Sequence, residues 1–258
     1  MAGSPKLSVI IRTKDEEKNI ERAIRSAQPV ADEIVVVDSG SKDNTVAIAK
    51  GLGAKVFFKE WEDYSSQLNY GIGLCEGEWV FVLDADEELT EELRQSIRTA
   101  INSGEYEIYM VNRRTYYMGR FLSHTWQPEW RIRLFKKGKV RFEGTLHEKV
   151  VFSGRVGKLK GYLNHYSFKS LYHHYAKSLD YARIMAERMK KEGRKFRIYN
   201  LLFNPFWSAF KVYFLKLGFL DGLRGLSVAF STFLYVFLKY LFLLELELKE
   251  RYGDELWK

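Results

Sequence analysis

The sequence predicts an α/β fold in which a largely parallel sheet is covered by helices, followed by a helical apolar region. Short apolar runs at residues 7–11, 34–37, 55–58 and 78–83 alternate with segments of helical periodicity. Runs that are apolar throughout are typical of parallel strands, because such strands are buried on both faces. The strongly apolar and aromatic composition of residues 199–247 predicts the helical region.

Helices fill the gaps between these strands. Apolar residues recur there at the spacing of one helical face: Ile20, Ala23, Ile24 and Ala27; Val46 and Ala49; Leu68, Ile72 and Cys75; Leu93, Ile97 and Ile101. Thr90 suits the N-cap of the last helix, and Asp43 or Asn44 suits that of the second. This alternation predicts a Rossmann-like half with helices on both faces of the sheet.

The pattern changes from about residue 105. Residues 107–114 and 130–144 alternate with a period of two around a Lys-Gly turn, which predicts antiparallel strands and therefore a mixed sheet. From about residue 168 the chain becomes helical and aromatic. The sequence thus predicts one α/β domain over residues 1–168 and a helical, apolar and basic region over residues 169–258.

Charge and cysteine content narrow the function. The formal net charge is +8 and the pI is about 9.3, which suggests an anionic partner such as a nucleotide, a nucleic acid or a membrane face. The single cysteine, Cys75, excludes an internal disulfide, and no Cys/His pattern indicates a zinc site. The apolar run near the N-terminus is too short for a signal peptide or a spanning helix, so we expect the catalytic part to be cytoplasmic.

Three polar clusters, RTKDEE, DSGSKD and DADEE, follow three of the predicted strands. The carboxyl ends of parallel strands share one edge of a sheet, where ligands bind. The sequence lacks both G-x-G-x-x-G after the first strand and a P-loop, which argues against a nicotinamide dehydrogenase and a P-loop enzyme. Asp84 and Asp86 can instead hold Mg²⁺ or Mn²⁺ against a substrate diphosphate. The alternative is an acidic turn that precedes a helix.

Asp38 ends the second predicted strand. Its carboxylate can accept a hydrogen bond from a nucleobase N–H or a ribose hydroxyl. Capping of the following turn is an equally good interpretation.

The segments LSVIIRTKDEEKNI, EIVVVDSGSKDNT and SQLNYGIGLCEGEWVFVLDADEEL resemble the nucleotide-sugar-binding half of family 2 glycosyltransferases, which have the GT-A fold. The resemblance covers roughly residues 6–168. The later segments PEWRIRLFKKGKVRFEGTLHEKV and FLDGLRG resemble the lipopolysaccharide core-type members, including glucosyltransferases that modify core heptose. The resemblance implies inverting transfer of glucose from a UDP-sugar, with Mn²⁺ or Mg²⁺, to a lipid-linked saccharide.

The resemblance also implies site residues. The nucleotide-binding positions are Arg12, Thr13, Lys14, Glu16, Asp38, Gln67, Asn69, Asp84 and Ala85. The first loop reads Arg-Thr-Lys-Asp-Glu where the family usually has Pro-x-Tyr-Asn-Glu, so its aromatic contact with the base is missing. Leu68 replaces the arginine of an Arg-Asn-x-Gly pattern, and Gln67 is expected to take over its polar contact. The metal positions are Asp84, Asp86 and His147.

An inverting transferase needs a general base for the acceptor hydroxyl. Glu129 matches the acid of the family's Glu-Asp motif, and Arg131 and Arg133 follow on the same strand face, where they can hold it ionised or bind phosphate. A surface ion pair is the alternative. Glu148 is the second candidate: it either orients His147 or is itself the base.

The C-terminal region predicts a membrane contact. Its longest uncharged run, Gly225 to Leu238, is short for a spanning helix, and Lys239 interrupts it. We therefore expect helices that lie on the cytoplasmic side of the inner membrane, with basic residues near anionic headgroups. The alternatives are a homodimer interface and a true spanning helix.

The sequence is also compatible with two other functions. A polyprenyl-phosphate sugar transferase of the same family would use a lipid phosphate as its acceptor. An RNA-binding module would suit the high pI and the 16% aromatic content. Because the aromatic residues cluster in apolar segments and do not alternate with basic residues on a sheet face, we expect no nucleic-acid partner.

Overall fold

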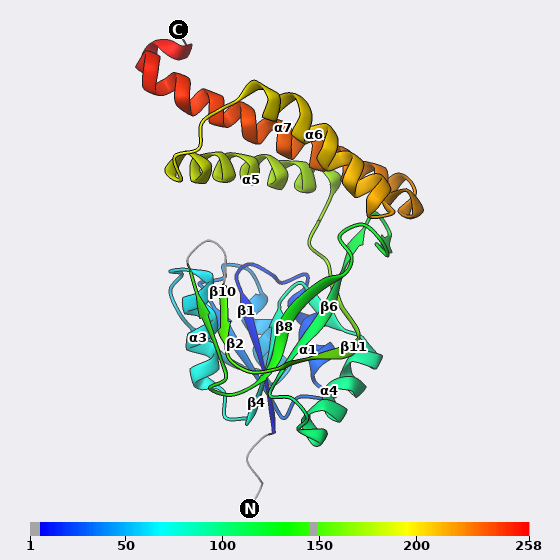
Figure 1. Cartoon of the computed structure of the whole chain (residues 1–258). Coiled ribbons are helices and arrows are strands. Elements are labelled where there is room, and N and C mark those ends of the chain that lie inside the picture. Colours follow the sequence, from blue (N-terminus) through cyan, green and yellow to red (C-terminus); the bar gives the residue numbers. More distant parts are fainter. Residues whose placement is uncertain (1–5, 145–148, 258) are drawn as a thin grey trace, which may run out of the picture. The chain divides into compact units, whose positions relative to one another are not determined.

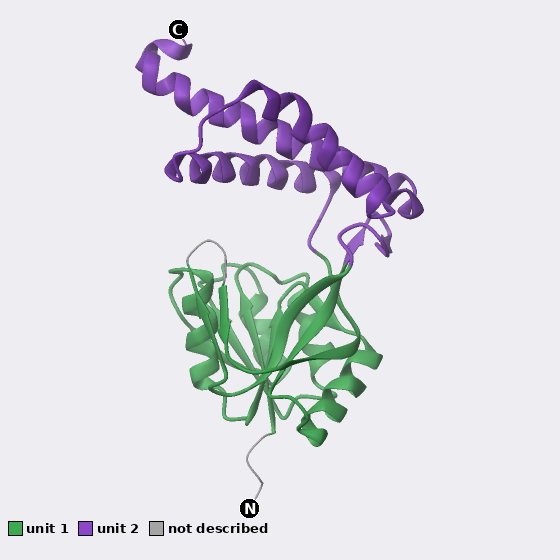
Figure 2. Ribbon diagram, viewed as in Figure 1, with its two compact units in different colours: residues 1–114, 128–166 green, residues 115–127, 167–258 purple. Residues whose placement is uncertain are grey.

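The computed structural model describes residues 6–144 and 149–257 (Figure 1). The chain divides into two compact units (Figure 2). Unit 1 comprises residues 1–114 and 128–166, and unit 2 comprises residues 115–127 and 167–258. The sequence gives no reason to separate residues 115–127 from the strands around them, yet they pack within unit 2.

A mixed sheet forms the centre of unit 1. In the described part of the chain its strand order is β3-β2-β1-β4-β8-β6-β11-β5, with β7 paired to β6. The parallel strands are β1 (Leu7–Thr13), β2 (Glu33–Asp38), β3 (Lys55–Phe58) and β4 (Trp79–Asp84). The others are β5 (Glu87–Leu89), β6 (Ile108–Tyr117), β7 (Arg120–Phe121), β8 (Glu129–Lys136) and β11 (Val156–His165). The antiparallel pairing of β8 with β4 makes the sheet mixed, which confirms the predicted fold class.

Helices cover both faces of this sheet. They are α1 (Ile20–Ala27), α2 (Thr45–Gly51), α3 (Tyr64–Leu74) and α4 (Glu91–Ser103). Val9 and Ile11 of β1 belong to one apolar core with α1 and α4, whereas Ile10 belongs to a second core with α3. This alternation follows from the pleat, which points successive side chains to opposite faces. The Thr90 hydroxyl accepts from the Leu93 N–H at 3.4 Å, so Thr90 is the N-cap that the sequence predicts.

Gly71 allows α3 to lie close to the sheet. A Cβ at this position would lie 2.0 Å from Ile10 Cδ1 and 2.8 Å from Val37 Cγ2, both in the buried core. A second, two-stranded sheet, β9 (Val140–Glu143) with β10 (Lys149–Phe152), packs beside the same helix. The glycine of the Asn-x-Gly pattern is therefore required by packing.

We predict that Gly71→Ala lowers the free energy of unfolding by about 1–3 kcal/mol, because the core must shift to admit the methyl group. Urea denaturation measures this change. Gly73→Ala in the same helix is the matched control, since a Cβ at Gly73 would meet nothing within 4 Å. The control should be neutral or stabilising, as alanine is the better helix former. Equal effects of the two substitutions would contradict this packing role.

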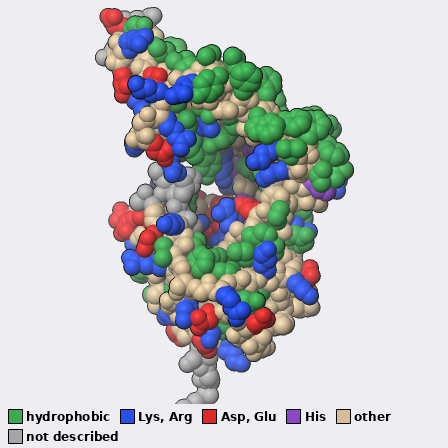
Figure 3. All heavy atoms as spheres, in the orientation of Figure 1, with side chains coloured by type: hydrophobic (Ala, Val, Ile, Leu, Met, Phe, Trp, Pro, Cys, Tyr) green, Lys and Arg blue, Asp and Glu red, His purple; other side chains and the backbone are tan. Residues whose placement is uncertain are grey.

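Unit 2 is built on three helices, α5 (Leu171–Lys191), α6 (Ile198–Phe210) and α7 (Leu223–Tyr252). The short helical segments η1 (Lys211–Leu215) and η2 (Gly218–Asp221) join α6 to α7, and η3 (Gly253–Trp257) follows α7. Ala186 and Met189 of α5 pack against Val236, Tyr240 and Leu243 of α7. Figure 3 shows that hydrophobic side chains also gather on the surface of this unit. Among the described helices, α7 is long and apolar enough to cross a membrane, by length and composition only.

Candidate active site

The strand register brings the predicted polar clusters to one edge. Thr13 of β1 pairs with Asp38 of β2, and Arg12 pairs with Asp84 of β4. The carboxyl ends of these three neighbouring strands therefore coincide. Residues far apart in the sequence meet there because the three strands end within one residue of each other in the pairing register.

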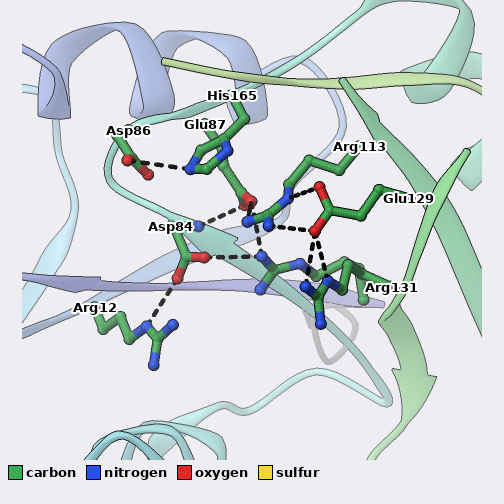
Figure 4. Close-up of polar contacts among 9 residues, drawn as sticks. Arg12, Asp84, Asp86, Glu87, Arg113, Glu129, Arg131 and His165 are labelled. Carbon is green, nitrogen blue, oxygen red and sulfur yellow. Dashed lines mark hydrogen bonds and ion pairs between the residues drawn. The ribbon is translucent and has the colours of Figure 1, made fainter. Parts of the chain in front are cut away.

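A chain of alternating charges starts at this edge (Figure 4). Arg12 Nε donates to Asp84 Oδ1 at 2.8 Å, and an Arg133 terminal nitrogen donates to Asp84 Oδ2 at 2.8 Å. The same Arg133 nitrogen lies 2.7 Å from Glu87 Oε1, which Arg113 also contacts at 3.3 Å. Glu87 is fully buried, and its other oxygen accepts the Asp84 N–H at 2.9 Å. Strands β1, β4, β5, β6 and β8 are linked by these contacts.

The Asp84 carboxylate is committed to this network. Burial alone would raise the pKa of Asp84, but the charges and hydrogen bonds of Arg12 and Arg133 outweigh burial and hold the pKa well below its usual range. Each carboxylate oxygen accepts from a different guanidinium group. Asp84 therefore holds two arginines at the strand ends, and its part in metal binding stays a prediction.

Glu129 stands at the other end of the chain of charges, as the first residue of β8. Arg113 holds its carboxylate with two hydrogen bonds, of 3.0 Å and 2.6 Å, and Arg131 approaches it at 2.7 Å. Burial would raise the pKa of Glu129, but the two arginines outweigh it and lower the pKa to about 2. The Glu129 N–H donates to Asn112 Oδ1, which fixes the start of the strand.

Asp86 lies beside a histidine that sequence reasoning missed. His165 Nε2, at the end of β11, is 3.3 Å from Asp86 Oδ2. The antiparallel pairing of β11 with β5 places His165 opposite Glu87, and the Tyr166 N–H donates to the Asp86 carbonyl at 2.9 Å. His165 Nδ1 is buried and has no hydrogen-bond partner among the described residues. An imidazole nitrogen and a carboxylate oxygen thus converge, while the described residues hold no group of three or more such ligands.

The loops after β1 and β2 are tied together. The Lys42 N–H donates to Asp15 Oδ1 at 2.7 Å, and the Glu16 N–H donates to Thr45 Oγ1 at 2.8 Å. Asp38 accepts from the N–H groups of Gly40 and Ser41 at 2.9 Å and 3.0 Å, so it caps its own turn. These contacts give the edge a rigid double loop.

The remaining nucleotide positions differ in their surroundings. Thr13 and Ala85 are buried, and Lys14 is exposed. The Glu16 side chain accepts from Asn19 Nδ2 at 2.7 Å, a contact within its own loop. His147 and Glu148 lie outside the described residues.

Gln67 and Asn69 hold backbone groups in this structure. The Gln67 amide donates to the carbonyls of Lys59 and Glu60 at 3.1 Å and 2.8 Å. Asn69 forms a reciprocal pair of bonds with the backbone of Phe142, at 2.8 Å and 3.1 Å. These amides fix the loop before α3 and the strand β9.

An aromatic ring lies beside Arg12. The guanidinium carbon of Arg12 is 4.6 Å from the ring centre of Tyr64, the first residue of α3. Trp61 packs edge-on against Tyr64, and both rings are 43% exposed. The sequence gives no signal for this contact, because it depends on how the loop before α3 returns to the end of β1.

Comparisons with known proteins show the family of this chain. The family model described as glycosyl transferase family 2 matches residues 8–162. An uncharacterized glycosyltransferase of Rickettsia typhi is 35% identical over 95% of this chain and 89% of its own length. The lipopolysaccharide core biosynthesis glycosyltransferase LpsC of Rhizobium meliloti is 30% identical over 90% of this chain and 89% of its own.

Among solved structures, glucosyl-3-phosphoglycerate synthase from Mycobacterium tuberculosis, in complex with Mn²⁺, UDP and glucosyl-3-phosphoglycerate, is 25% identical. The match covers 46% of each chain with a TM-score of 0.37, too low to bear on substrate or metal. The family model and these two relatives, which match along most of the chain, show the family. This chain belongs to glycosyltransferase family 2 and is a glycosyltransferase.

Proposed function

We propose that the chain transfers glucose from UDP-glucose, with inversion, to a saccharide on a membrane glycolipid such as a lipopolysaccharide core heptose. The observation that carries this proposal is the chain of charges that joins Asp84, at the nucleotide edge of the sheet, to Glu129, at the start of β8. These contacts connect Asp84, the acid on the donor side, with Glu129, the candidate general base. The relative LpsC, named for core biosynthesis, supports the class of acceptor.

The donor nucleotide binds, in this proposal, along the double loop formed after β1 and β2. Asp38 and the Arg12 loop face the base and ribose. Tyr64 supplies the ring face that the first loop lacks, because an exposed ring beside a guanidinium group can stack on a planar base. Lys14 is exposed and can reach the nucleotide.

Asp86 and His165 are the described residues that fit a divalent cation. They offer one carboxylate oxygen and one imidazole nitrogen, 3.3 Å apart. A cation held there would neutralise negative charge on the departing diphosphate. An imidazole ligand favours Mn²⁺ over Mg²⁺, which prefers oxygen ligands. His147 remains a proposed further ligand.

Glu129 is the proposed general base. The acceptor hydroxyl oxygen bonds to the anomeric carbon as the bond to the diphosphate oxygen breaks, and the hydroxyl proton passes to Glu129. Arg131 is 55% exposed, against 16% for Arg113, so Arg131 is the arginine that an incoming acceptor can displace from the carboxylate. Arg131 and Arg133 can also bind phosphate on the acceptor or donor. Glu148 is the alternative base.

The test of the donor is a calorimetric titration of UDP, GDP, TDP and ADP into the full chain, with and without Mn²⁺. We expect UDP to bind, at least tenfold more tightly with Mn²⁺ than without it. Transfer of labelled glucose is then measured with core oligosaccharide and with polyprenyl phosphate as acceptors. Failure of all four nucleotides to bind would contradict the proposed donor site, and transfer to polyprenyl phosphate alone would contradict the proposed acceptor.

A further inference from the structure

We propose that α6, η1, η2 and the start of α7 form a docking face for the anionic surface of a lipid bilayer, and that the hairpin at residues 117–120 belongs to this face. The inference deepens the proposed function, since a glycolipid acceptor lies at such a surface. Every contact used to argue it lies within unit 2.

The apolar surface of this segment is unusually exposed. Among the described residues of α6, only Pro205 is buried, although the helix is mostly apolar. Phe203, Phe206 and Trp207 are 69%, 65% and 58% exposed, and Leu223 at the start of α7 is 78% exposed. Soluble monomers rarely expose apolar patches of this extent, which mark protein or membrane contacts.

The exposed charged side chains of the same segment are all positive. Asp221 is the only acid in the sequence between Glu192 and Glu245, and it is buried. Lys211 and Lys216 are exposed on the segment itself. Lys195 and Arg197 precede α6 and are exposed as well, whereas Arg194 pairs with the exposed Glu192 at 3.2 Å. An apolar face with cations and no exposed acid matches a bilayer surface, where hydrocarbon lies beneath anionic headgroups.

Arg224 of the FLDGLRG segment holds the hairpin to this face, and Asp221 of the same segment holds the loop that follows the hairpin. The Asp221 carboxylate accepts the N–H groups of Ser123, His124 and Thr125 at 3.0, 3.2 and 2.7 Å. Arg224 Nε donates to the Met118 carbonyl at 2.8 Å.

These contacts of Asp221 and Arg224 depend on the close approach of Gly218 and Gly225. A Cβ at Gly225 would lie 1.8 Å from the carbonyl oxygen of Gly218, so the start of α7 can pack on η2 only without a side chain there. The hairpin tip then presents Met118, which is 46% exposed, and the exposed Arg120. The tip thus repeats the combination of apolar and basic side chains found along α6.

A second copy of the chain is the rival occupant. In a two-fold interface the same patch meets itself, so the lysines and arginines of one copy would face those of the other. Because the segment exposes no acid to compensate them, self-association through this face is disfavoured. Anionic headgroups remove that repulsion, and the bilayer is therefore the occupant that the charges select.

The experiment is flotation of the full chain with vesicles of phosphatidylethanolamine and phosphatidylglycerol, compared with phosphatidylcholine vesicles, at low and high salt. We expect binding to the anionic vesicles that weakens with salt. Phe203→Ser with Phe206→Ser should lower the partition coefficient at least tenfold, since two large apolar side chains are lost. Lys211→Glu with Lys216→Glu should lower binding to anionic vesicles at least tenfold and leave weak binding to phosphatidylcholine unchanged.

Matched controls come from unit 1. Phe58 is 68% exposed, and Lys158 and Lys160 are two exposed lysines of β11. Phe58→Ser, and Lys158→Glu with Lys160→Glu, should bind vesicles as the wild type does, and circular dichroism checks that every variant is folded. Vesicle binding needs neither donor nor acceptor, so its result is independent of the proposed transfer reaction.

Three outcomes would overturn the proposal. The wild type fails to bind anionic vesicles; the α6 and η1 variants bind as well as the wild type; or the chain is a dimer that Phe203→Ser with Phe206→Ser dissociates while vesicle binding is absent. The last result would assign the face to a second copy.

Discussion

Glu129→Gln is expected to lower kcat for sugar transfer by about 10³-fold and to leave the affinity for UDP-glucose unchanged, in line with the usual contribution of a general base. Glutamine keeps the shape of the side chain and one oxygen that Arg113 and Arg131 can contact, but it cannot accept the acceptor proton. The fall therefore lies in the chemical step. Single-turnover transfer and calorimetric donor binding, measured on the same preparation, separate the two quantities.

Glu107→Gln is the matched control for this substitution. Glu107 precedes β6 and forms an exposed ion pair with Lys139 at 2.9 Å. Like Glu129 it is a glutamate paired with a cation, but it lies outside the candidate active site. We expect its kcat to stay within about twofold of the wild type, as surface ion pairs contribute little. Near-normal transfer by Glu129→Gln would instead assign the base to Glu148.

The pKa of Glu129 adds a second readout. With a pKa of about 2, Glu129 is ionised throughout the usual assay range and is a weak base while both arginines hold it. Removing a positive charge raises a carboxyl pKa, so Arg131→Gln should move the acid limb of the kcat/KM profile to higher pH. A purely structural Glu129 would leave that limb where it is.

The sequence predicts the parallel half of unit 1 because that half is governed by local patterns. Apolar runs and helical spacing are visible in short windows, and Thr90 caps α4 through a contact only three residues long. The meeting of the polar clusters follows from the same pattern, since parallel strands share their carboxyl edge.

The antiparallel half depends on register, which short windows do not carry. Arg113 reaches Glu129 because β6 pairs with β8 in a register that shifts between Tyr109 and Met110. His165 reaches Asp86 only through the pairing of β11 with β5. Residues 115–127 pack in unit 2 through Asp221, 98 residues from Ser123.

Asp86→Ala is expected to remove the Mn²⁺-dependent part of UDP binding, a loss of about 100-fold in affinity at saturating Mn²⁺. The reason is that Asp86 supplies the anionic oxygen of the proposed pair, and a cation held by His165 alone keeps too few ligands to bridge a diphosphate. Calorimetry of UDP at fixed Mn²⁺, and of Mn²⁺ alone, measures the loss without any turnover. Asp180→Ala, at an exposed position of α5, is the control and should bind as the wild type does.

His165→Ala tests whether His165 or His147 is the histidine that binds the cation beside Asp86. The structure favours His165, and the sequence predicts His147. If His165 is a ligand, the substitution should lower Mn²⁺ affinity at least tenfold and also reduce the preference for Mn²⁺ over Mg²⁺, because the site loses its nitrogen ligand and keeps only oxygen. A histidine with a merely structural role would change both affinities together or neither. Unchanged Mn²⁺-dependent UDP binding in His165→Ala, together with its loss in His147→Ala, would transfer the ligand role to His147 and leave Asp86 as its partner.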